Sequence, residues 1–117
     1  MRLEKNWRLL RLLRLIPKGR VTTYKIIGEK AGVGPRQAGW ILKNNARPDL
    51  YPCYKVIKSD GRLGGYAGSQ KKNIKKKIKL LEKDGIKISR GKVVGFSGII
   101  WEFDGRDKKQ VGGLSGF

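Results

Sequence analysis

Prolines and glycines divide the first 45 residues into short helical segments, and this division constrains the fold more than any other feature of the sequence. Residues 6–16 carry apolar side chains at intervals of three and four, the spacing of one helix face: Leu9, Leu12, Leu13 and Ile16. Pro17 and Gly19 end this helix, because neither residue continues helical geometry readily. With 117 residues in all, elements of this length predict one small domain rather than two.

Two further helices follow, with a glycine-containing turn between them. Thr22 or Thr23 can cap the first of them through a side-chain oxygen. Pro35 suits the first turn of the second, which we expect to run from Arg36 to about Asn45. Helix, turn and helix in this order predict a helix-turn-helix, although other helical hairpins share the pattern.

A fourth helix is predicted over residues 70–83, with an apolar stripe at Ile74, Ile78 and Leu81. Lysines cover its remaining positions, and their mutual repulsion weakens the helix unless phosphate groups lie nearby. A solvated basic face is the simpler interpretation. The lysines concerned are Lys71, Lys72, Lys75, Lys76, Lys77 and Lys79.

After this helix, residues 86–88 and 92–103 are typical of strands. We therefore expect a mainly α fold with short β elements, in which a winged-helix-like DNA-binding domain spans residues 1–103. Residues 104–117 combine glycines and mixed charges with few apolar anchors, so we expect a flexible tail there.

The charge of the chain points to a polyanionic partner. Lysine and arginine number 28 against 9 acidic residues, a net charge of +19, which favours nucleic acid over an anionic membrane surface. No apolar run approaches the roughly 20 residues of a spanning helix. Charges also interrupt every apolar stretch before Pro17, so we expect no signal peptide and no contact with a membrane.

A single cysteine and the absence of histidine exclude several kinds of chemistry. One cysteine cannot form an intramolecular disulfide or a cysteine zinc cluster, and without histidine there is no Ser-His-Asp or Cys-His pair. We expect neither a metal site nor a cofactor. One free thiol fits a cytoplasmic setting, and we expect a monomer.

Several motifs resemble those of the O6-alkylguanine-DNA alkyltransferases. Pro52-Cys53-Tyr54-Lys55-Val56 resembles their Pro-Cys-His-Arg-Val active-site motif. Arg36-Gln37-Ala38-Gly39 resembles the Arg-Ala-Val-Gly of their recognition helix, and Thr23-Tyr24 resembles the Ser/Thr-Tyr that opens the helix-turn-helix. Gly65-Tyr66-Ala67-Gly68 resembles the loop that borders their pocket, and residues 80–85 resemble their Leu-Leu-x-x-Glu-Gly.

The spacing of these motifs supports the resemblance. Arg36 lies 17 residues before Cys53 and Asn45 lies 8 before it, where the family has its arginine finger and its active-site asparagine. Each motif alone is a weak signal, but together, in this order, they cover roughly residues 6–88.

The resemblance implies a specific function. The family binds duplex DNA through the minor groove and flips the damaged guanine into a pocket, where the cysteine takes the alkyl group from O6 and is not regenerated. The implied partner is double-stranded DNA that contains O6-alkylguanine. A sister group, the alkyltransferase-like proteins, carries Trp or Ala in place of the cysteine and flags the lesion for nucleotide excision repair proteins.

The implied catalytic residues are Cys53, Tyr54, Asp84 and Asn45. Cys53 stands at the alkyl acceptor, but Tyr54 occupies the place of the histidine that relays the thiol proton, and Asp84 that of the glutamate which orients it. Tyrosine, with a reference pKa near ~10, is a poor base at neutral pH. Asn45 joins the recognition helix to the active-site loop, and it also suits an ordinary helix C-cap.

The implied DNA contacts lie on the recognition helix. Arg36 stacks in the gap that the flipped base leaves, although a phosphate contact is an alternative role for it. The small residues Ala38 and Gly39 allow the helix to approach a narrow groove. The full set of DNA contacts is Tyr24, Arg36, Gln37, Ala38, Gly39 and Lys43, and the lesion pocket comprises Tyr24, Pro52, Val56, Tyr66 and Ala67.

Three functions remain open from the sequence. Cys53 favours a single-turnover alkyltransferase, a methylated-DNA–protein-cysteine methyltransferase weakened by the missing histidine. The absence of histidine, the lack of a counterpart to the enzymes' N-terminal domain, and Gln37 favour a non-enzymatic lesion sensor. A plain winged-helix DNA-binding protein would not explain why Pro52-Cys53 is in register with Arg36.

Overall fold

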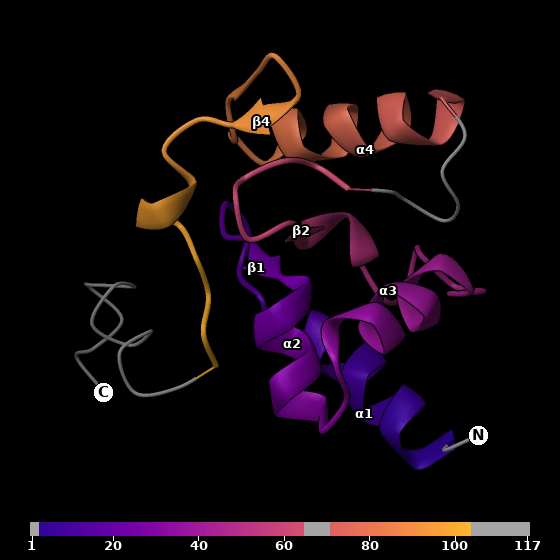
Figure 1. Ribbon diagram of the computed structural model, residues 1–117. Coiled ribbons are helices and arrows are strands. Elements are labelled where there is room, and N and C mark those ends of the chain that lie inside the picture. Colours follow the sequence, from indigo (N-terminus) through magenta and orange to yellow (C-terminus); the bar gives the residue numbers. More distant parts are fainter. Residues whose placement is uncertain (1–2, 65–70, 104–117) are drawn as a thin grey trace.

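In the computed structural model, which describes residues 3–64 and 71–103, the helices form two layers with a short strand pair between them (Figure 1). The lower layer contains α1 (Leu3–Leu13), α2 (Tyr24–Ala31) and α3 (Pro35–Lys43). The upper layer contains α4 (Lys71–Lys83) and a hairpin of β3 (Ile88–Ser89) and β4 (Lys92–Val93). The mainly α class with short strands, expected from the periodicity, is confirmed.

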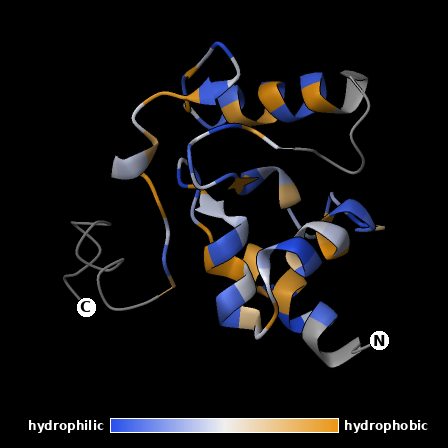
Figure 2. Ribbon diagram, viewed as in Figure 1, coloured by the Kyte–Doolittle hydropathy of each residue, from blue (hydrophilic) through white to orange (hydrophobic). Residues whose placement is uncertain are grey.

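The lower layer is held together by the apolar faces of its three helices, which turn toward one another in Figure 2. Leu9 and Leu13 of α1 are fully buried against this core. The helix α1 begins and ends about three residues earlier than predicted, yet Ile16 in the following turn stays buried. Burial of these side chains removes apolar surface from water, which stabilises the layer.

The helix-turn-helix comprises α2 and α3, and its local signals act as predicted. The Thr23 hydroxyl oxygen accepts a hydrogen bond from the Ile26 backbone N–H at 3.1 Å, which caps α2. Pro35 occupies the first turn of α3, which ends at Lys43, two residues before the predicted end. Gly28 allows the turn to pass close to α2, since a Cβ there would lie 2.8 Å from the Val33 carbonyl oxygen.

A parallel strand pair joins the two layers. Here β1 (Thr22–Thr23) pairs with β2 (Val56–Ile57), and the 3-10 turn η1 (Cys53–Lys55) lies directly before β2. The pairing sets Thr22 opposite Val56, although they are 34 residues apart in the chain. As a result, the Pro-Cys motif lies beside the start of the helix-turn-helix.

The region after β4 differs from the strand predicted over residues 92–103. The strand β4 covers only Lys92–Val93, because Gly95 adopts a left-handed conformation (φ +66°) and a 3-10 turn, η2 (Phe96–Gly98), follows. Residues 99–101 then return to the lower layer, where the Val21 N–H donates to the Ile99 carbonyl oxygen at 2.9 Å. The C-terminal segment therefore braces the entry to β1 rather than extending the hairpin.

Two predictions fall outside the described residues: the tail over 104–117 and the pocket loop with Tyr66 and Ala67. The domain boundary at residue 103 also stays a prediction. Among the helices that the structure describes, none is long and apolar enough to span a bilayer.

Candidate functional site

Cys53 lies where the two layers meet. It begins η1 directly after Pro52, is 3% exposed, and packs in the lower core with residues of α1, α2 and α3. The thiol is not part of a disulfide. A buried thiol at the start of a short turn, beneath α4, can act as a nucleophile only if a neighbour favours its ionised form.

Asn45 fixes the loop that leads from α3 to Cys53. Its side-chain amide donates to the Tyr51 carbonyl oxygen at 2.8 Å, and its carbonyl oxygen accepts from the Arg47 N–H at 3.1 Å. Asn45 is 7% exposed, so these bonds satisfy polar atoms that water reaches poorly. The link between recognition helix and active-site loop that the resemblance implied is present in these two bonds.

Tyr54 and Asp84 form the pair that the motif comparison suggested. The Tyr54 hydroxyl donates a hydrogen bond to an Asp84 carboxylate oxygen at 2.6 Å, across 30 residues of sequence. Tyr54 is half-buried, and its ring lies 5.8 Å from the Lys55 ammonium nitrogen. Lys55 itself donates to the Ile16 carbonyl oxygen at 2.7 Å, so it ties η1 to the end of the first helical segment.

Lys77 is a site residue that sequence reasoning missed. We expected it on the lysine-covered face of the fourth helix, but it is 0% exposed and donates hydrogen bonds to the carbonyl oxygens of Val56, at 2.6 Å, and Leu63. Burial lowers the pKa of Lys77 from 10.5 to about 7, while the charge of Cys53 opposes this shift. The signal was present in the sequence, because position 77 lies on the apolar stripe between Ile74 and Leu81.

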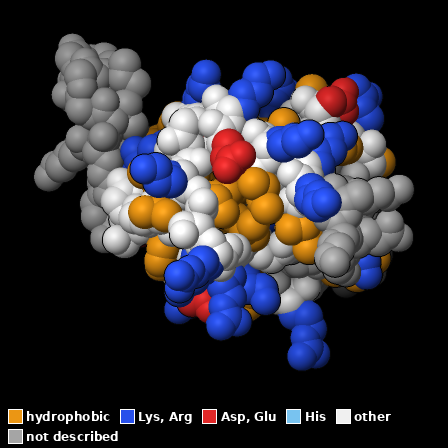
Figure 3. All heavy atoms as spheres, turned by 90° about the horizontal axis from the view of Figure 1, so that it is seen from above, with side chains coloured by type: hydrophobic (Ala, Val, Ile, Leu, Met, Phe, Trp, Pro, Cys, Tyr) orange, Lys and Arg blue, Asp and Glu red, His pale blue; other side chains and the backbone are white. Residues whose placement is uncertain are grey.

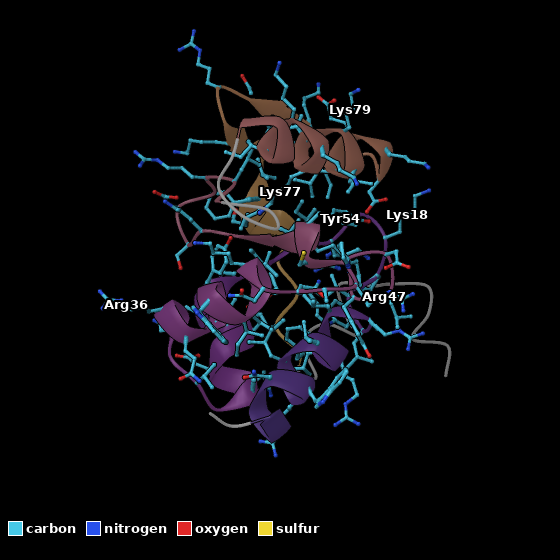
Figure 4. The ribbon with its side chains drawn as sticks, turned by 90° about the vertical axis from the view of Figure 1, so that its right-hand side faces the viewer. Lys18, Arg36, Arg47, Tyr54, Lys77 and Lys79 are labelled. Atoms are coloured by element: carbon cyan, nitrogen blue, oxygen red, sulfur yellow. The ribbon has the colours of Figure 1, made fainter. Side chains whose placement is uncertain are left out.

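Figure 4 shows how the lysines of α4 divide. Lys77 points inward, beneath the helix and toward the region of Tyr54, whereas Lys79 points out of the molecule. The Lys77 nitrogen also lies 6.0 Å from the centre of the Tyr24 ring. The buried amine of Lys77 therefore lies near η1 and β2, which follow Pro52, and near Tyr24 at the start of α2.

Tyr24 and Gly64 meet at the edge of this region. Gly64 has φ +71°, and a Cβ on it would lie 2.6 Å from the Tyr24 hydroxyl oxygen. Only glycine allows both the backbone conformation and the close approach. The Tyr24 ring is thus held against the start of the segment that leads into the predicted pocket loop.

The outer face of α3 carries the predicted DNA contacts. Arg36 is exposed and projects away from the ribbon in Figure 4. It stands between two shallow hollows of about 530 and 480 Å³, and both include it in their walls. The first is lined by Tyr24, Lys25, Pro35, Arg36, Gly39, Lys58 and Ser59, and the second by Gly34, Arg36, Gln37 and Trp40.

The structure corrects one predicted DNA contact and adds a residue. Ala38 is fully buried on the inner face of α3, where its small side chain lets α2 pack closely, so it does not face the hollows. Trp40, four residues after Arg36, is 49% exposed and had no role in the prediction. Lys43 is exposed in the last turn of α3.

Basic side chains also spread over the upper layer. Figure 3 shows this face from above, where lysines and arginines surround a hydrophobic patch and acidic groups are few. In the part of the chain that the structure describes, no cluster of cysteine and acidic residues could hold a metal ion. The exposed cations of α4 and the hairpin include Lys75, Lys76, Lys79, Lys83, Arg90 and Lys92.

A helix-turn-helix with a basic outer face and a buried thiol behind it defines a DNA-binding domain with a cysteine site. The chain belongs to the family described as 6-O-methylguanine DNA methyltransferase, DNA binding domain, which matches residues 4–86. It is 48% identical over 75 residues to a methylated-DNA–protein-cysteine methyltransferase from Pyrobaculum aerophilum, a match over 64% of this chain and 49% of that protein. The chain thus spans about half the length of the curated relatives it matches.

Solved structures show the same fold. Atl1 from S. pombe, in complex with damaged DNA that contains O6-carboxymethylguanine, superposes with a TM-score of 0.70 at 25% identity, over 86% of this chain and 98% of that one. OGT from Mycobacterium tuberculosis in complex with DNA gives 0.63 at 29% identity, over 73% of this chain and 51% of that one.

Proposed function

We propose that this protein binds duplex DNA containing O6-alkylguanine and accepts the alkyl group on Cys53. The observation that carries the proposal is a buried thiol at η1, in a loop that Asn45 holds through the Tyr51 carbonyl and beside a strand that Lys77 holds through the Val56 carbonyl. The family membership and the methyltransferase relatives support the same chemistry.

The proposed reaction is a single displacement. The Cys53 thiolate attacks the alkyl carbon, a carbon–sulfur bond forms, and the carbon–oxygen bond to the guanine breaks with its electron pair moving to the base. The guanine anion then takes up the proton that the thiol released. A thioether is a stable product, so each molecule reacts once.

The proposed approach to DNA uses the outer face of α3. Arg36 stands between the two hollows, where it can enter the duplex as a base leaves the stack. Arg36, Gln37, Gly39 and Lys43 are the exposed or half-exposed members of the predicted set, and Tyr24 borders the same face. Pro52, directly before Cys53, is half-buried and suits a wall of the lesion pocket, whereas the Val56 side chain is fully buried and leaves only its backbone for that role.

A lesion sensor without transfer is the second candidate, and two observations favour it. The hydroxyl of Tyr54 is a hydrogen-bond donor to Asp84, so no histidine relay operates at this position. The fold is also that of Atl1, whose solved structure is a complex with damaged DNA, with a TM-score of 0.70. Such a sensor would hand the lesion to excision repair proteins.

Intact mass measurement separates the candidates. The protein is incubated with a duplex carrying one O6-methylguanine, and with the same duplex carrying guanine as control. A gain of one methylene with the lesion duplex, absent in Cys53→Ala, supports transfer to Cys53; a gain that persists in Cys53→Ala contradicts the assignment.

Binding to the lesion duplex without any gain in mass supports the sensor. Equal affinity for both duplexes, again without a gain in mass, contradicts both candidates and leaves general DNA binding.

A further inference from the structure

We propose that Lys77 is the residue that ionises Cys53 and so replaces the missing histidine as the partner of the thiol. The inference rests on the proposed function and deepens it, because an ionised Cys53 is needed only if the protein transfers the alkyl group. Its chemistry, an ammonium that stabilises a buried thiolate, can be tested without DNA.

Burial is the first argument. Lys77 is fully buried, and an isolated buried ammonium is costly unless hydrogen bonds or an opposite charge compensate it. Two backbone carbonyls accept hydrogen bonds from its nitrogen, and they belong to Val56 and Leu63 on opposite sides of a turn. These two bonds hold the Lys77 nitrogen at one point, and carbonyl oxygens favour its protonated form once it takes up a proton.

Position is the second argument. Val56 follows the η1 turn directly, and its N–H donates to the Cys53 carbonyl oxygen, so the Lys77 nitrogen is bonded to the residue that closes the turn carrying the thiol. Burial lowers the pKa of Lys77, and the charge of a Cys53 thiolate acts in the opposite direction by favouring the protonated amine. The effect is reciprocal, because an ammonium beside a thiol favours the thiolate by the same free energy.

Other titratable groups of the described residues near η1 have hydrogen bonds of their own. The Tyr54 hydroxyl donates a hydrogen bond to Asp84, and the Lys55 ammonium donates to the Ile16 carbonyl oxygen. From α2, the group that faces Lys77 is the Tyr24 ring. On α4, Lys75, Lys76 and Lys79 are exposed and stand on the outer side of the helix.

Proton transfer balances within the pair. The amine of Lys77 takes the proton of the Cys53 thiol, which leaves an ammonium beside a thiolate. After the thiolate has displaced guanine from the alkyl carbon, the guanine anion needs one proton, and the ammonium holds one. Direct transfer or transfer through water returns Lys77 to its neutral form.

The first experiment titrates Cys53 by the ultraviolet absorbance of its thiolate, with Cys53→Ala subtracted to remove the tyrosine signal. Because the chain has one cysteine, the signal belongs to one group. Lys77→Gln keeps N–H donors for the two carbonyls but removes the charge, and it is expected to raise the midpoint by about one pH unit or more. The rate of reaction with iodoacetamide near neutral pH should fall about 10-fold.

Two variants complete this experiment. Lys77→Arg keeps the charge and is expected to keep the wild-type midpoint, whereas Lys79→Gln, two residues along the same helix and exposed, is expected to change nothing. A folded Lys77→Gln protein, checked by circular dichroism, with the midpoint of the wild type overturns the proposal and leaves Lys77 as a structural brace.

A second experiment covers the case in which Lys77→Gln does not fold. Lysine side chains labelled with ¹³C are titrated by NMR in the wild type and in Cys53→Ser, a small change at the other partner. One lysine signal is expected to titrate far below the ordinary value, and Cys53→Ser should lower its midpoint further because the thiolate is gone. Absence of such a signal, or no response to Cys53→Ser, overturns the proposal.

These measurements also separate the two levels of inference. If Lys77→Gln changes the ionisation midpoint of Cys53 but the wild type transfers no methyl group, the proposed function is refuted and the pairing of Lys77 with Cys53 stands. Methyl transfer that proceeds at the wild-type rate in a folded Lys77→Gln protein refutes the pairing and keeps the proposed function.

Discussion

Cys53 and Tyr54 are neighbours in the chain, yet each interacts with a different residue of the α4 region. Cys53 neighbours Lys77, while Tyr54 bonds to Asp84, seven residues further along and therefore on the same face. The proton relay that the motif suggested and the charge that acts on the thiol are thus separate features of this protein.

Tyr54→Phe tests that separation at the residue scale. The change removes the hydroxyl that bonds to Asp84 at 2.6 Å, and we expect the free energy of unfolding to fall by about 1–3 kcal/mol. The midpoint of Cys53 ionisation should stay where it is. Urea unfolding and thiol titration of the same protein check both; a shifted thiol midpoint would mean that Tyr54 acts on the sulfur after all.

Lys77 also predicts how stability depends on pH. Its pKa is about 7 in the folded protein and near 10.5 in the unfolded chain, so between these values the unfolded chain holds a proton that the folded protein has released. Stability therefore rises with pH across this window, by about 1 kcal/mol per pH unit, and the penalty for the buried charge is full below it.

Urea unfolding between about pH 7 and 9 measures this effect. Both proteins carry Cys53→Ser, so that thiol titration does not contribute, and one also carries Lys77→Gln. As pH rises, the free energy of unfolding of the protein with Lys77 should increase relative to that of the Lys77→Gln protein. A difference that is flat with pH contradicts the buried, deprotonated amine.

Arg36→Ala distinguishes a stacking residue from a phosphate anchor. Loss of an intercalated side chain removes stability only from the flipped state, at roughly 1–3 kcal/mol, so discrimination between O6-methylguanine and guanine duplexes should fall about 5- to 150-fold. Lys43→Ala, on the same exposed face, is the control and should weaken both duplexes equally. Equal weakening by Arg36→Ala would make it a phosphate contact.

At the scale of elements, two glycines of the helix-turn-helix predict opposite effects of the same substitution. Gly28→Ala brings a methyl group to 2.8 Å from the Val33 carbonyl oxygen, and we expect a loss of about 1–3 kcal/mol in stability. Gly39→Ala meets nothing within 4 Å and should add about 0.5–1 kcal/mol, because alanine loses less entropy in a helix.

Gly39→Ala should also change the affinity for DNA. Gly39 lines the hollow beside Arg36, so the added methyl group should weaken DNA binding while it raises the melting temperature. Thermal unfolding and fluorescence anisotropy on one preparation measure both quantities. Unchanged affinity in Gly39→Ala would indicate that this side of α3 does not approach the DNA.

At the scale of the whole molecule, the net charge of +19 predicts a strong salt dependence. If about six to eight phosphates are contacted, the logarithm of the binding constant should fall against the logarithm of salt concentration with a slope of about −5 to −7. Anisotropy with undamaged duplex at increasing potassium chloride measures it. A slope shallower than about −2 would show that most cations lie away from the DNA.

Local signals in the sequence were enough to predict the helices, because each helix is determined largely by the residues within it and at its ends. Helix spacing, the Thr23 cap and Pro35 describe contacts within a few positions of each other, and each acts in the structure as expected. The Tyr54–Asp84 bond spans 30 residues; the family motifs placed the two residues at the histidine and glutamate positions, but the bond between them was not predicted.

Tertiary structure alone decided the positions that depend on distant partners. Lys77 lies on the apolar stripe of α4, but carbonyl oxygens 21 and 14 residues away accept the hydrogen bonds that allow a lysine to be buried there, and helical periodicity does not show such acceptors. The strand expected over residues 92–103 ends at Val93, because the left-handed Gly95 and the turn η2 follow, and bonding to Val21 then holds residues 99–101 at the lower layer. Ala38 turned inward for the same reason: packing against α2, not its own small size, determined which face it occupies.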